Sequence, residues 1–269
     1  MTTPVWPTDP RQADVAEVQR FLVAAARDGA APLPDLIAVD LCALGGAFQS
    51  VFDEPVWQAW VNLPDDYRDE LAGDSFRGLV GRRLMDPPQP DPEAGGESVA
   101  RVAPPLALIM MARSRPAFVV QCALDGEQRG APRMYGIAED GLGLRAVLVE
   151  RASNERIGLG VREHVTLSAA EDRARADDLH QLYKYLLLSP ARAVSVLASW
   201  ACADQPPGTR TLDLYRHRAA EQLTRTTVTV LRQPDGSCVS SRDGAPLDAR
   251  TEHDVAEELT RLVILETTQ

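Results

Sequence analysis

Lysine is almost absent from this sequence: Lys184 is the only one, and arginine supplies nearly all of the positive charge. Together with the many alanines, this composition is typical of GC-rich coding and favours an actinobacterial source. Acidic residues outnumber basic ones, 39 to 28, which gives a formal net charge of −11. Because phosphate groups are bound by clustered basic side chains, this balance argues against a general nucleic-acid-binding protein and against binding to anionic membranes.

Cysteine is also scarce, with four residues dispersed along the chain: Cys42, Cys122, Cys202 and Cys238. None forms a CxxC pair, so the sequence predicts neither a zinc site nor a redox motif. Each lies among apolar neighbours or in a predicted helix or strand. We therefore expect buried free thiols in a reducing cytosol.

Segments that direct a chain to or across a membrane are not evident. Residues 1–7 have neither the basic region nor the apolar region of a signal peptide. The longest apolar run, about 103–112, is shorter than the ~20 residues that span a bilayer. We therefore expect a cytoplasmic protein with no membrane-spanning segment.

Catalytic motifs are missing too. The glycine pairs within 141–143 and 158–160 lead neither into a third glycine and a helix nor into a Gly-Lys-Ser/Thr ending, so hairpin turns explain them better than a phosphate loop. No GxSxG sequence is present to hold a nucleophilic serine. The histidines lack a partner at metal-ligand spacing; they are His164, His180, His217 and His253. We predict no cofactor, no metal site and no enzymatic activity. A small-molecule enzyme of unidentified reaction is the alternative.

Residues 64–85 leave another alternative, an acidic regulator that contains a winged helix. Arg77, Arg82 and Arg83 could lie on the second helix of such a unit. A recognition helix, however, needs basic and polar side chains on one exposed face. Apolar residues and six acidic residues surround these arginines, so a solvated helix face is favoured over a DNA-binding surface.

Hydrophobic periodicity and turn residues predict a mixture of helices and short strands. The expected helices cover about 9–28, 33–44, 64–84, 104–111, 169–188, 190–201, 211–224 and 251–265. The expected strands cover about 117–124, 133–138, 144–151, 161–167, 226–231 and 237–241. Ser168 with Glu171 should form a capping box, and Thr251 should cap the last helix, with Asp254 favouring its first turn.

The order of strands and helices repeats once along the chain. With an offset of 76 residues, the expected helix near 169–188 aligns with the helix near 252–265; Asp172 falls on Asp248 and Leu186 on Leu262. We therefore predict one α+β domain over 1–269, with antiparallel sheets, helices packed on one face, and two halves related by a pseudo-two-fold. Its parts would be a helical region 1–85, a proline-rich loop 86–98, and the halves 99–188 and 189–269.

Three stretches of the sequence resemble the EspG family. They are YRDELAGDSFRGLV (67–80), PPLALIMMARSRPAFVVQCAL (104–124), and the terminal TVTVLRQPDGSCV followed by DVAEELTRLV (227–239 and 254–263). The resemblance covers about 55–265 in the order and type of elements. It departs in the first ~50 residues and in the proline-rich segment 86–98.

The resemblance implies a cytoplasmic chaperone of type VII (ESX) secretion. Such a protein binds a helical secretion substrate, a heterodimer of the PE–PPE kind, and keeps it soluble until export. It implies binding through the sheet surface and the C-terminal helices. The sequence identifies neither the client nor the oligomeric state.

Four strand positions are our candidates for binding this partner: Tyr135, Ile137, Val228 and Val230. Their alternation along two predicted strands could gather them into an apolar patch if helices leave one sheet face uncovered. Core packing is the alternative for each of them. On the first interpretation, Val228→Asp should abolish client binding and leave the fold intact.

Overall fold

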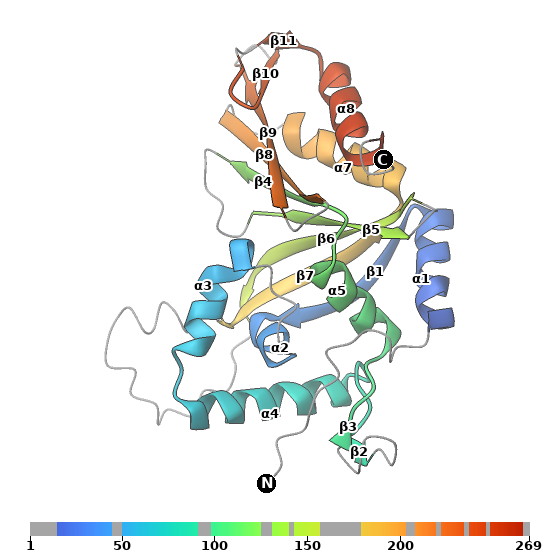
Figure 1. The fold of residues 1–269 in the computed structure, drawn as a ribbon, viewed down its shortest axis with the longest axis vertical. Helices are drawn as coiled ribbons and strands as arrows, with labels where there is room; N and C mark the ends of the chain where they lie inside the picture. The colour runs from blue at the N-terminus through green and yellow to red at the C-terminus, as the bar shows by residue number, and fades with distance from the viewer. Residues whose placement is uncertain are drawn as a thin grey trace. The chain divides into compact units, whose positions relative to one another are not determined.

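A computed structural model describes residues 15–44, 50–90, 98–124, 131–139, 143–156, 179–202, 208–218, 222–233, 237–245 and 248–265. The fold class is α+β with an antiparallel sheet, which confirms the prediction (Figure 1). The chain divides into two compact units, each built from separate stretches of sequence. Unit 1 comprises 1–21, 33–115 and 152–184, and unit 2 comprises 22–32, 116–151 and 185–269. These boundaries do not coincide with the predicted halves 99–188 and 189–269.

Unit 1 is mainly helical. Its helices are α2 (Ala38–Ala43), α3 (Ser50–Val61), α4 (Asp65–Gly81) and α5 (Pro104–Ser114), and short β2 (Gln89–Pro90) pairs antiparallel with β3 (Ser98–Val99). Helix α1 (Val15–Asp28) is shared between the two units. Short α2 packs against α3 and α4. Buried apolar residues on α4, such as Leu71, Phe76 and Leu79, contribute to the core.

Unit 2 contains most of a nine-stranded sheet with the order β1-β7-β6-β5-β4-β8-β9-β10-β11. In this sheet order, every strand from β6 to β11 pairs antiparallel with its neighbour in that range. The strands are β1 (Ala30–Ile37), β4 (Val119–Leu124), β5 (Arg133–Glu139), β6 (Gly143–Arg156), β7 (Gln181–Leu188), β8 (Gly208–Arg218), β9 (Gln222–Arg232), β10 (Cys238–Arg242) and β11 (Asp248–Arg250). Residues 33–37 of β1, 152–156 of β6 and 181–184 of β7 belong to unit 1.

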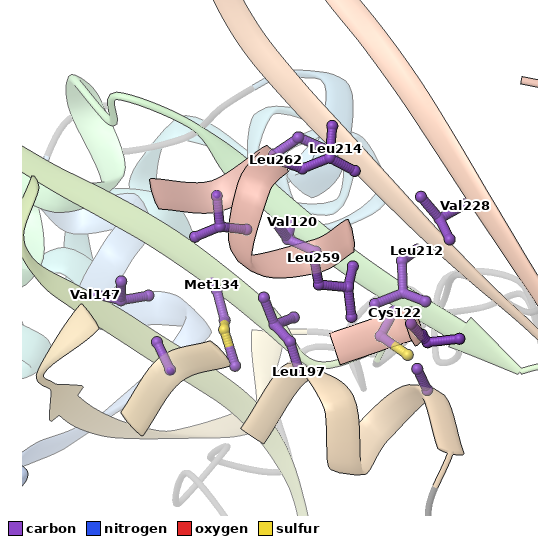
Figure 2. Packing of buried hydrophobic residues seen from close by; sticks show 14 of the residues in the cluster. Val120, Cys122, Met134, Val147, Leu197, Leu212, Leu214, Val228, Leu259 and Leu262 are labelled. Carbon is purple, nitrogen blue, oxygen red and sulfur yellow. The ribbon is translucent and has the colours of Figure 1, made fainter. Parts of the chain in front are cut away.

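Two helices, α7 (Pro190–Cys202) and α8 (Glu252–Thr260), cover one face of the unit 2 sheet and contact each other. In Figure 2, Leu197 of α7 and Leu259 of α8 lie with the strand residues Met134, Cys122 and Leu212 in one buried apolar cluster. Alternate strand residues supply this cluster because successive side chains of a strand point to opposite faces. The strand residues between those of the cluster therefore lie on the opposite face of the sheet, which α7 and α8 do not cover.

Helix α8 begins as the sequence predicts. Thr251 Oγ1 accepts a hydrogen bond from the Asp254 backbone N at 3.2 Å, and Asp254 Oδ2 accepts one from the Thr251 backbone N at 2.8 Å. This reciprocal pair satisfies two backbone donors that no residue inside the helix can reach. The predicted capping box at Ser168 and Glu171 lies outside the described residues.

Several predicted helices are wrong. Residues 181–188 form β7. In the predicted helix 211–224, residues 211–218 belong to β8 and 222–224 to β9, and 219–221 lie outside the described residues. In the predicted helix 33–44, residues 33–37 belong to β1 and only Ala38–Ala43 are α-helical. The predicted strand 161–167 and residues 169–178 of the predicted helix lie outside the described residues. The other predicted helices and strands are confirmed over the described residues, with shifted ends; residues 9–14 of the first helix lie outside them. The predicted loop 86–98 contains β2 and the first residue of β3, and the predicted helical region 1–85 contains β1.

The correspondence behind the two predicted halves also fails at Leu186 and Leu262. Leu186 lies in a β-strand, whereas its counterpart Leu262 lies in the π-helical turn Arg261–Leu265 that follows α8. Asp172 lies outside the described residues, and its counterpart Asp248 begins β11. The apolar spacing that suggested equivalent helices therefore belongs to two different kinds of element.

Candidate interaction surface

The face of the unit 2 sheet opposite α7 and α8, here called the second face, carries a row of buried polar residues. Residues that face each other across an antiparallel pair lie on the same side of the sheet. The register pairs Glu150 with Arg133, Arg133 with Gln121, Gln121 with Asp213, and Asp213 with Thr227. Five adjacent strands, from β6 to β9, thus contribute one polar row. The four residues from Glu150 to Asp213 are all buried.

Glu150, at one end of this row, accepts three hydrogen bonds. Its Oε1 accepts hydrogen bonds from Arg133 NH1 at 3.3 Å and from the Tyr135 hydroxyl at 3.2 Å. Its Oε2 accepts a hydrogen bond from the Tyr185 hydroxyl at 2.9 Å. A buried carboxylate is tolerated only when a cation and hydrogen-bond donors replace its water shell. Donors on β5 and β7 do so here.

Asp213 forms a second centre at the other end of the row. Arg225 holds its carboxylate through two nitrogens, with Nε 3.0 Å from Oδ1 and NH2 2.8 Å from Oδ2. The Thr227 hydroxyl donates to Oδ1 at 2.7 Å. The hydrogen bond to Asp213 raises the pKa of the Arg225 guanidinium, which also lies 5.8 Å from the centroid of the Tyr215 ring. Burial, with a smaller contribution from Asp213, raises the pKa of the Tyr215 hydroxyl.

Beyond Asp213 the second face becomes accessible. Side chains there are half-buried, and Arg225 is 52% exposed. We call this area the β8–β10 patch; it consists of Thr209, Thr211, Arg225, Thr227, Thr229, Leu231, Val239 and Ser241. At its centre Thr229 faces Thr211 on one side and Ser241 on the other. The patch thus combines hydroxyl groups and short apolar side chains with an arginine that a buried carboxylate holds in place.

The four predicted partner-binding residues do not form an exposed patch, so that prediction is corrected. Val228 and Val230 belong to the cluster beneath α7 and α8. Tyr135 and Ile137 alternate with Met134, a member of that cluster, and therefore lie on the second face. All four are buried. The prediction grouped the two pairs on one face, but the strand register places them on opposite faces of the sheet. The sequence alone does not reveal this register.

Two of the three arginines considered for DNA binding, Arg77 and Arg82, pair with carboxylates of unit 1. Arg77 pairs with Asp74 one turn earlier on α4. Arg82 NH2 lies 2.7 Å from Oδ2 of buried Asp40, whose Oδ1 accepts a hydrogen bond from Ser75 at 2.6 Å. These contacts fasten α4 to α2 and support the interpretation of a solvated helix face.

Potential metal ligands and thiols give no site in the described part of the chain. No group of three or more His, Cys, Asp or Glu residues there could hold a metal ion. Cys42, Cys122 and Cys238 are buried and form no disulfide within these residues, as predicted. Of the four histidines, His164 lies outside the described residues and His253 is exposed on α8. Within the same residues, no helix combines the length and apolarity needed to cross a membrane.

The side chains of the second face are better placed to bind a partner and to stabilise the sheet than to transfer protons. Both oxygens of Asp213 and both oxygens of Glu150 already accept hydrogen bonds from protein donors. A general base needs an accessible oxygen that points at a substrate. Arg225, in contrast, presents an oriented guanidinium beside accessible hydroxyl groups. Asp213, Arg225 and Glu150 were not among the residues predicted to be functional. The one feature of the sequence that indicates them is that these charged residues lie within apolar or β-branched strands.

Comparison with protein-family models finds none that matches this chain, and comparison with curated proteins likewise finds no match.

Proposed function

We propose that this protein is a cytoplasmic, chaperone-like binding protein that recognises a helical type VII secretion substrate, a heterodimer of the PE–PPE kind, and keeps it soluble. The resemblance of 67–80, 104–124 and the C-terminal hairpin and helix to the EspG family suggests this class of partner. On this proposal the protein has no enzymatic activity and works without a cofactor.

One observation carries the proposal: α7 and α8 cover one face of the unit 2 sheet, and the other face bears the β8–β10 patch. A helix of the client could lie along this surface, where Thr211, Thr229 and Ser241 would provide hydrogen-bonding groups. Leu231 and Val239 would add apolar contact. Mixed surfaces of this kind are ordinary for protein interfaces that form and dissociate.

Arg225 is the expected anchor of the interface. Arginine is enriched among the few residues that dominate binding energy. Asp213 and the Tyr215 ring already restrict its side chain, so less conformational entropy remains to be lost on binding.

Co-expression with PE–PPE pairs tests the proposal. The tagged chain should co-purify with one pair in stoichiometric amounts and elute with it as a single complex in size-exclusion chromatography. Thr229→Glu, which places charge and bulk at the centre of the patch, should weaken the complex by at least tenfold. Ser199→Glu on the exposed side of α7 is the matched control, because it also replaces a small hydroxyl side chain by glutamate, and it should bind as the wild type does.

One result would overturn the proposed function, and another would overturn only the proposed binding surface. If no PE–PPE pair forms a complex with the folded wild-type chain, the partner class is wrong. If a pair binds but Thr229→Glu and Ser199→Glu bind equally well, the chaperone function stands and the β8–β10 patch is the wrong surface. Circular dichroism and thermal unfolding of both variants would show that each remains folded.

A further inference from the structure

We draw no further inference here: the strongest candidate, the half-exposed β8–β10 patch with Arg225 at its edge, belongs to the site already described, its arginine is neutralised by Asp213, and nothing in the described residues shows what covers it.

Discussion

The Tyr185 hydroxyl donates a hydrogen bond of 2.9 Å to Oε2 of Glu150 and so ties β7 to its neighbour β6. Both side chains are buried. The carboxylate also receives Arg133 and Tyr135 on its other oxygen. The buried Glu150 carboxylate depends on each of these hydrogen-bond donors, because water cannot take the place of a donor that is lost.

Tyr185→Phe should therefore destabilise the protein by about 1.5 kcal/mol, since it removes one donor to a buried charged acceptor and changes little else. Urea unfolding followed by circular dichroism measures the effect. Tyr67→Phe on α4 is the matched control, because Tyr67 is half-buried and its hydroxyl forms no hydrogen bond that is seen among the described residues; we expect a change below about 0.5 kcal/mol. Equal losses in the two variants would contradict a structural role for the Tyr185–Glu150 bond.

Arg225→Ala should cost about 2 kcal/mol, because the buried Asp213 carboxylate then keeps the Thr227 hydroxyl but loses its cation. Water will reach part of the vacated space, since the Arg225 side chain is 52% exposed, and this limits the loss. Arg192→Ala on α7 removes an exposed arginine for which no ion pair is seen within the described part of the chain, and it should change stability by less than about 0.5 kcal/mol. The Asp213–Arg225 pair contributes nothing to stability if the two variants unfold at the same urea concentration.

Gly136→Ala should destabilise the sheet by about 1–3 kcal/mol. A Cβ at this position would lie 2.4 Å from Cε1 of Phe118, whose ring is itself buried, so a strand or the ring must move. Gly78→Ala is the opposite case: this position of α4 is exposed, and no described atom outside the helix backbone lies within 4 Å of the added carbon. That substitution should stabilise the helix by about 1 kcal/mol. A neutral Gly136→Ala would show that Phe118 can move without cost.

Alkaline pH should weaken the fold through Cys122. Burial raises the pKa of this thiol from 9.0 to about 11, although nearby Arg210 opposes the change. The folded state thus favours the neutral thiol, and the stability that follows is present below about pH 9 and is lost as the pH rises towards 11. By about pH 11 the loss should reach about 2 kcal/mol.

Comparison with Cys122→Ala isolates this contribution, because other groups, Tyr215 among them, titrate in the same range. The stability advantage of the wild type over the variant, measured by urea unfolding, should shrink between about pH 8 and pH 11. An advantage that stays constant over this range would mean that Cys122 does not ionise on unfolding.

Local signals in the sequence predicted the elements whose ends and faces are set by neighbouring residues. The Thr251–Asp254 capping box fixes the start of α8, and the proline pair at Pro104 and Pro105 marks the start of α5. In β7 such signals conflict. Leu179, Leu182 and Leu186 have helical spacing, yet Tyr183, Tyr185 and Leu187 are buried in alternation with exposed Lys184 and Leu186. Pairing with neighbouring strands decides such a segment, because it satisfies the backbone and buries the alternating residues together.

The sequence by itself determined the α+β class, the burial of the described thiols and most of the helices, because these follow from composition, periodicity and caps within a few residues. The tertiary structure alone decided which side of the sheet each strand residue occupies. Register joins Glu150, Arg133, Gln121 and Asp213 into one row although they are far apart in the sequence. It also separates Tyr135 from Val228, because a strand has a repeat of two residues and a shift by one residue exchanges its faces.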